Sequence, residues 1–131
     1  MLKGGRDLAY STGLVFIYSL PKASRLTKPE QFSAVFHANK AESGTAFQVL
    51  VNPSRRQTAR LGVVLSKKVA PRAVDRNYLK RLIREEFRMC KHNLGGLDVV
   101  VRVLKQPSKA QSREARMELS NLIIKVSRWG A

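Results

Sequence analysis

The stretch "RNYLKRLIREEFR", Arg76–Arg88, places five basic residues in a segment that also repeats apolar side chains at helical spacing. Pro71, a residue favoured in the first turn of a helix, precedes this stretch, and Gly95 follows it. The sequence therefore predicts one amphipathic helix between these two residues. At about 100° per residue, its apolar flank consists of Leu79, Leu82, Ile83, Phe87 and Cys90.

The basic residues of this predicted helix lie on a different stripe. At i, i+4 spacing they are Arg76, Lys80, Arg84 and Arg88. Like charges at this spacing destabilise an isolated helix by roughly 0.2 to 0.5 kcal/mol per pair, and only Glu85 and Glu86 lie nearby to offset them. A solvated helix face usually mixes both signs, so the stripe is predicted to bind the phosphate backbone of a nucleic acid.

The whole chain shares this positive charge. Its 131 residues include 25 Lys and Arg against 9 Asp and Glu, which gives a formal net charge of +16. A chain of this length forms one domain, and the excess charge indicates a polyanionic partner, nucleic acid before an anionic membrane surface. Cys90 is the only cysteine, and neither it nor His37 and His92 shows metal-binding spacing, which fits a reducing cytosol.

The N-terminal segment requires a separate interpretation. Lys3 and Arg6 precede a mostly apolar run, 8–20, which is about as long as the core of a signal peptide. Asp7, the polar breaks in the run and the lack of a small-residue cleavage site argue against export. The run is also too short to span a membrane. We expect residues 1–18 to form a poorly ordered or peripheral extension and residues 19–131 to form the domain.

Regular segments are predicted on both sides of the basic helix. Residues 45–52 and 59–68 are rich in β-formers and are separated by the turn-like segment 53–58, so two adjacent antiparallel strands are expected there. The other predicted elements are a short helix from Pro29 to about Ala38, a strand over Leu97–Leu104 and an amphipathic helix within 112–129.

The segment "SKKVAPRAVDRNYLKRLIREEFR", Ser66–Arg88, resembles the signature of the bacterial ribonuclease P protein component, a strand ending in SKK followed by an R-N-R-x-K-R-x-x-R helix. Tyr78 stands where that pattern has its second arginine. The resemblance covers the chain from Ser19 to the C-terminus. It extends through Arg25–Phe36, Arg60–Lys68 and Asp98–Val103.

This resemblance implies a fold. It is a single α+β domain in the order helix, strands, helix, strand, helix, with a central four-stranded sheet, like the second domain of ribosomal protein S5. The family's β-α-β unit is left-handed, whereas the general rule for parallel crossovers would predict the right-handed form.

The resemblance also implies a function. The chain would be an accessory subunit of an endoribonuclease that matures the 5′ end of tRNA in the cytoplasm, with ribonuclease P RNA and precursor tRNA as partners and no membrane partner. Catalysis would come from the RNA subunit with Mg²⁺, so no protein residue is assigned as catalytic or metal-binding. The implied RNA-binding set is Lys67, Lys68, Arg72, Arg76, Asn77, Lys80, Arg81, Arg84 and Arg88.

A second implied site is a cleft between the first helix and the sheet, which would hold the single-stranded 5′ leader. Phe32 and Phe36 match its aromatic pair, although their i, i+4 spacing is also that of ordinary core residues. Phe47 is expected to share the cleft or to fill the core. Tyr78 lacks the motif charge, so weaker RNA affinity is expected from it, with stacking or a hydrogen bond in place of an ion pair.

Other function classes stay open on the residues alone. A structural or ribosomal RNA-binding protein would share the charge but not the arginine-asparagine helix after SKK. A protein-only nuclease would need clustered carboxylates or a histidine pair, and the acidic residues are scattered along the chain. A secreted, membrane-active cationic protein rests only on the apolar N-terminal run.

Overall fold

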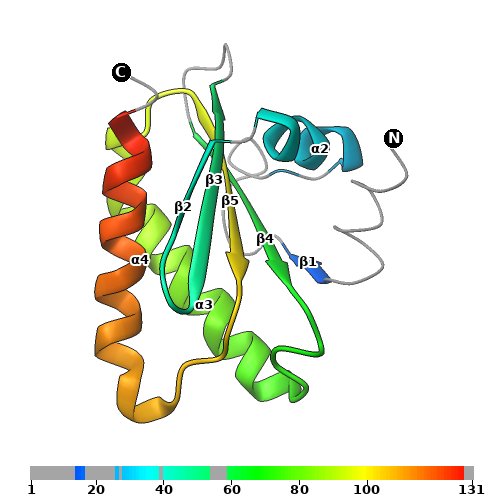
Figure 1. Ribbon diagram of the computed structural model, residues 1–131, viewed down its shortest axis with the longest axis vertical. Coiled ribbons are helices and arrows are strands. Elements are labelled where there is room, and N and C mark those ends of the chain that lie inside the picture. Colours follow the sequence, from blue (N-terminus) through cyan, green and yellow to red (C-terminus); the bar gives the residue numbers. More distant parts are fainter. Residues whose placement is uncertain (1–13, 17–25, 27, 39, 54–58, 129–131) are drawn as a thin grey trace.

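The computed structural model describes residues 14–16, 26, 28–38, 40–53 and 59–128 (Figure 1). The strands are β1 (Leu14–Phe16), β2 (Lys40–Ser43), β3 (Phe47–Pro53), β4 (Arg60–Leu65) and β5 (Leu97–Val103). The α-helices are α2 (Pro29–Ala38), α3 (Ala73–Cys90) and α4 (Ser112–Ser127). Two short 3₁₀ turns, Lys91–Asn93 and Lys109–Gln111, follow α3 and precede α4, respectively.

The strands form one mixed sheet in the order β1-β4-β5-β3-β2. Every neighbouring pair is antiparallel except β4 and β5, which are parallel and joined through α3. In Figure 1 both strands run downward and α3 crosses behind them, which makes this crossover left-handed. The predicted single α+β domain with a four-stranded sheet is confirmed in β2 to β5.

Two details of the predicted sheet need correction. The strands at 45–52 and 59–68 were expected to be adjacent, but β5 lies between β3 and β4 and pairs with both. The reason is that β5 is buried almost throughout, as expected for a strand in the middle of a sheet. The short strand β1 also extends the sheet beyond four strands, by pairing with β4.

The structure tests the prediction for the N-terminal segment only in part. Of the extension expected at 1–18, residues 14–16 form the edge strand β1, and the others lie outside the described residues. The turn-like segment at 54–58 also lies outside them. The boundary between an extension and a domain at residue 19 stays a prediction.

The sheet separates two hydrophobic cores. The larger core lies between the sheet and α3 and α4, and the smaller one lies under α2 on the opposite face. Gly62 on β4 allows the close approach of α2, because a Cβ atom there would clash with the ring of Phe32. Two helices therefore cover one face of the sheet and one helix covers the other, and the long helix α3 packs against α4 and β4.

Candidate nucleic-acid interface

The predicted basic helix is α3, and its two flanks are arranged as the spacing indicated. Leu79, Leu82, Ile83 and Phe87 are buried in the larger core. The helix begins two residues after Pro71. After the short 3₁₀ turn the chain reverses at Gly95, whose φ of 57° lies in the left-handed region that favours glycine.

The SKK segment forms the turn that joins β4 to α3. The backbone N–H groups of Val69 and Ala70 donate to the Ser66 carbonyl at 3.1 and 3.0 Å, and the Ser66 hydroxyl accepts from the N–H of Lys68 at 3.0 Å. This compact turn leaves the side chains of Lys67 and Lys68 exposed. Both are thereby held next to the first turn of the basic helix.

Arg76 has a structural contact that the sequence did not indicate. Its Nη1 atom donates to the carbonyl oxygens of Ala70 and Pro71, at 2.9 and 2.7 Å. These bonds fix the linker between the SKK turn and the helix. A substitution of Arg76 would therefore disturb the backbone as well as remove a charge.

Lys80 is the most perturbed of the basic residues. It is only 7% exposed, and its ammonium group lies 3.4 Å from Oδ1 of Asn77. Burial, and secondly the nearby charge of Arg76, lower the pKa of Lys80 to about 8. An anion bound next to Lys80 would favour the charged ammonium and raise that pKa again.

The remaining basic side chains of α3 carry uncompensated charge. Arg81 and Arg88 are exposed, and Arg84 is half-buried. None of the three forms an ion pair with an acidic side chain in the part of the chain that the structure describes. Nε of Arg84 is buried without a hydrogen-bond partner in the protein, an arrangement that an acceptor such as a phosphate oxygen would relieve.

The acidic residues next to this stripe are directed elsewhere. Arg116 of α4 donates to Glu85 at 2.9 Å and to Glu86 at 3.3 Å. These carboxylates raise the pKa of Arg116, Glu85 being the larger influence. The sequence did not indicate this contact, because 31 and 30 residues separate the partners. Two acids that could neutralise the stripe are thus paired toward the neighbouring helix.

We name the resulting surface the basic flank. It comprises Lys67, Lys68, Arg72, Arg76, Lys80, Arg81, Arg84 and Arg88, together with the exposed amide of Asn77. One α-helix and the turn before it therefore carry every predicted RNA-binding residue. Basic residues clustered along one helix and its preceding turn are typical of a nucleic-acid-binding surface.

The three phenylalanines predicted for a leader cleft do not share one site. Phe32 is fully buried in the core under α2, and Phe47 is fully buried in the core on the opposite face of the sheet. Of the two alternatives expected for Phe47, the structure shows the second, because its position in β3 directs the side chain into the larger core and away from a cleft under α2. Phe32 has no exposed surface for a base to stack on, whereas Phe36 is half-buried.

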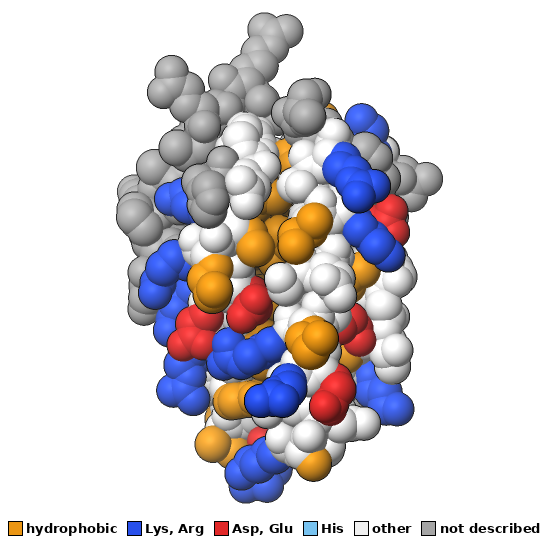
Figure 2. All heavy atoms as spheres, turned by 90° about the vertical axis from the view of Figure 1, so that its left-hand side faces the viewer, with side chains coloured by type: hydrophobic (Ala, Val, Ile, Leu, Met, Phe, Trp, Pro, Cys, Tyr) orange, Lys and Arg blue, Asp and Glu red, His pale blue; other side chains and the backbone are white. Residues whose placement is uncertain are grey.

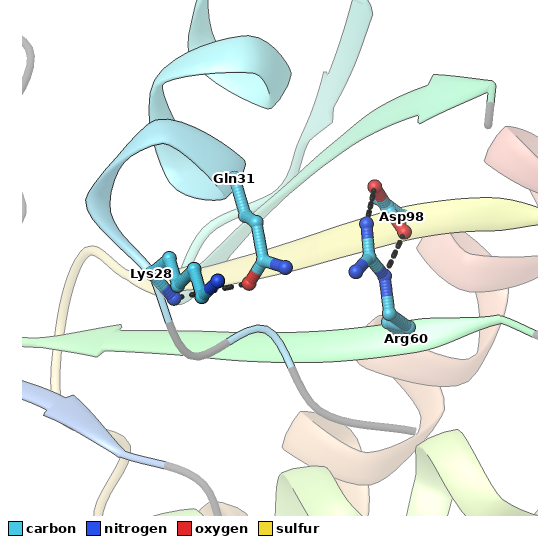
Figure 3. Close-up of polar contacts among 4 residues, drawn as sticks. All are labelled: Lys28, Gln31, Arg60 and Asp98. Atoms are coloured by element: carbon cyan, nitrogen blue, oxygen red, sulfur yellow. Dashed lines mark hydrogen bonds and ion pairs between the residues drawn. The ribbon is translucent and has the colours of Figure 1, made fainter. Parts of the chain in front are cut away.

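A buried ion pair lies on the α2 side of the sheet (Figure 3). Arg60 donates through Nε and Nη2 to the two carboxylate oxygens of Asp98, at 2.8 and 2.7 Å. This bidentate bond is the main cause that raises the pKa of Arg60. Asp98 is 4% exposed and Arg60 is half-buried, so the pair connects β4 to β5 and both charges are engaged with each other.

Metal-ligating side chains are scattered among the described residues. No group of three or more His, Cys, Asp or Glu within them could hold a metal ion. Burial raises the pKa of the Cys90 thiol, which disfavours the thiolate that a nucleophile needs. None of the helices in this part of the chain combines the length and apolar character required to cross a bilayer.

The fold and the basic flank together define a class of protein, a small basic α+β domain with a left-handed crossover and an arginine-rich helix. Comparison with known sequences identifies the family, because the family model for ribonuclease P matches residues 20–127. The chain belongs to the ribonuclease P protein component family. Members of this family take part in an endoribonuclease complex that processes tRNA and contains RNA.

Individual relatives agree with this assignment. The chain is 42% identical over 114 residues to the ribonuclease P protein component of Chromobacterium violaceum, covering 87% of this chain and 94% of the relative. It is 43% identical over 111 residues to that of a Psychrobacter species, covering 83% and 85%, respectively.

Solved structures of similar proteins show the same fold. The RNase P protein of Staphylococcus aureus matches with a TM-score of 0.62 and 26% identity, over 82% of this chain and 94% of that one. The RNase P protein of Thermotoga maritima matches with a TM-score of 0.61 and 28% identity, over 82% and 97%.

Proposed function

We propose that this chain is the protein subunit of ribonuclease P, and that its basic flank binds the catalytic RNA while the enzyme removes the 5′ leader of precursor tRNA in the cytoplasm. The observation that carries the proposal is the pairing of charges around α3. Arg81, Arg84 and Arg88 form no ion pair with an acidic side chain among the described residues, whereas Glu85 and Glu86 are paired with Arg116 of α4. Contacts from such a row go mainly to phosphates, so the shape of the RNA would determine which RNA is bound.

Leader binding is the second part of the proposal, and Phe36 is its main aromatic residue. Phe36 lies on the helix that covers the sheet and keeps part of its surface exposed. Arg102, also half-buried, follows Val100 at i+2 on β5 and therefore lies on the same face of the sheet as the core under α2. An aromatic ring and a cation on one face suit a single strand of variable sequence.

Magnesium in this proposal belongs to the RNA. Mg²⁺ prefers carboxylate and phosphate oxygens and keeps several of its waters. Asp98, Glu85 and Glu86 already accept hydrogen bonds from arginines, and Glu118 accepts them from backbone N–H groups. The protein would instead neutralise phosphates, so that the RNA folds and binds substrate at lower Mg²⁺.

The test is multiple-turnover cleavage of a precursor tRNA by a bacterial ribonuclease P RNA at low Mg²⁺, with and without this protein. We expect efficient cleavage only in the mixture, and none by the protein alone. Cleavage by the protein alone would show that its own residues catalyse the reaction. RNA binding without stimulation would favour the second candidate, a structural or ribosomal RNA-binding protein.

The leader contact can be tested separately, by comparing the binding of precursor tRNA and mature tRNA. The substitution Phe36→Leu keeps most of the apolar volume and removes the aromatic ring. Affinity for precursor tRNA should fall about fivefold or more, because stacking is worth roughly 1 to 3 kcal/mol per base, and affinity for mature tRNA should stay unchanged. Equal losses for both RNAs would remove Phe36 from the leader site.

A further inference from the structure

A surface cavity of about 630 Å³ lies between the first half of α3 and the connection from β5 to α4. Pockets of about 300 to 1,000 Å³ are typical for small-molecule ligands. The α3 wall includes Arg72, Asn77, Tyr78 and Arg81, and the opposite wall includes Ser108 and Lys109. Three of these residues belong to the basic flank, so the cavity opens beside that surface.

Hydrogen bonds fix the second wall of the cavity. The N–H of Ser108 donates to Oε1 of Gln111 at 3.2 Å, and the N–H of Gln111 donates to the Ser108 carbonyl at 2.9 Å. The N–H of Leu104 donates to the carbonyl of Ala46 at 2.7 Å, which anchors the connection to the sheet. The cavity therefore lies between a regular helix and a capped turn, and both walls are preformed.

Tyr78 gives the cavity its chemical character. Its half-buried side chain packs against the larger core and also lines the cavity. The charged lining residues are Arg72, Arg81 and Lys109, against the single acid Asp75. An aromatic ring flanked by cations fits a flat base that carries a phosphate.

We propose that this cavity binds one unpaired nucleotide of the partner RNA. Tyr78 would stack on the base, the three cations would contact the 5′-phosphate, and Asn77 and Ser108 would offer hydrogen bonds to the base or ribose. The choice of RNA as partner rests on the proposed function. The ribonuclease P pattern has an arginine at position 78, so in this chain stacking would replace an ionic contact at that point of the motif.

The cavity can be tested on the protein alone, with adenosine 5′-monophosphate as the probe and nuclear magnetic resonance as the readout. We expect shift changes at Tyr78, Ser108 and Lys109, and much smaller changes with inorganic phosphate or ribose 5-phosphate. The variant Tyr78→Leu should bind the nucleotide about tenfold more weakly. Equal responses to phosphate alone, or an unchanged affinity in the leucine variant, would overturn the proposal.

The same variants separate this proposal from the proposed function. Met89→Leu is the matched control, because Met89 is an exposed α3 residue that does not line the cavity. Thermal unfolding of each variant checks that it is folded. If Tyr78→Leu binds ribonuclease P RNA as the control does while Arg81→Ala binds weakly, the cavity proposal fails and the RNA subunit proposal stands. If none of the variants changes binding, the basic flank is not the RNA interface.

Discussion

The helices α3 and α4 cover the same face of the sheet, and they use their charges differently. Five basic and three acidic residues lie in α3, and three basic and two acidic residues lie in α4, so their net charges differ by only one. In α4 the two signs are interspersed on the surface, as Figure 2 shows from the side of that helix. Composition alone could therefore not distinguish an RNA-binding helix from a structural one.

The two helices differ in the groups to which their charged side chains are bonded. Glu118 of α4 accepts hydrogen bonds from the N–H groups of Ala46 and Phe47 at 2.8 and 2.9 Å, which attaches α4 to the sheet. Arg116 pairs with the two glutamates of α3. Two of the charged side chains of α4, Glu118 and Arg116, thus serve internal contacts, and Arg116 pairs with the acidic residues next to the basic flank.

The largest expected effect distinguishes the two helices directly. Replacing the exposed Arg81 and Arg88 of α3 by alanine should weaken binding of ribonuclease P RNA by about 100-fold, because each lost contact to a charged group is worth roughly 1.5 to 3 kcal/mol. The matched control replaces the exposed Arg113 and Lys125 of α4 by alanine, and should change the dissociation constant less than threefold. Equal losses would mean that net charge alone governs binding.

A smaller effect should depend on pH. Lys80 has a pKa of about 8 in the free protein, and a phosphate bound nearby would raise it, so RNA binding takes up a proton. Affinity should therefore fall as pH rises through 8, by about tenfold between pH 7 and pH 9. The variant Lys80→Arg keeps its charge over this range and should give a flatter profile. Parallel profiles for both proteins would exclude Lys80 from the interface.

The smallest expected effect concerns the contact between the helices. Arg116→Met leaves Glu85 and Glu86 without their partner, close to the basic flank. RNA binding should weaken about threefold at low salt, because the freed carboxylates repel the phosphates of the RNA. Salt ions screen part of this repulsion. Adding Glu85→Gln and Glu86→Gln to this variant should restore binding. If the triple variant stays as weak as Arg116→Met, the defect is one of packing and not of charge.

Local patterns predicted the elements that carry the basic flank. The apolar repeat, Pro71 and Gly95 together predicted where α3 begins and ends. These signals are local, because they lie within the helix or a few residues from its ends. The position of β5 between β3 and β4 did not follow, because strand order depends on pairings between distant segments. The short strands β1 and β2 have too few residues for a clear alternation.

The site was predictable to a similar extent. The basic residues of the flank follow from helical spacing, but the structural bonds of Arg76 and the pairing of Arg116 depend on the tertiary fold. The sequence does not show which of Phe32, Phe36 and Phe47 is accessible. In the structure Phe32 and Phe47 are buried on opposite faces of the sheet, whereas Phe36 keeps part of its surface exposed. Side-chain type and spacing predict chemistry, whereas accessibility requires the structure.

The most direct test of the account is the salt dependence of RNA binding, measured for the natural protein, for Arg81→Ala with Arg88→Ala, and for Arg113→Ala with Lys125→Ala. The slope of the logarithm of affinity against the logarithm of salt concentration counts the phosphates that the protein neutralises. We predict a steep slope that decreases by about two in the α3 variant and stays unchanged in the α4 variant. An unchanged slope in the α3 variant would contradict the assignment of the basic flank as the RNA interface.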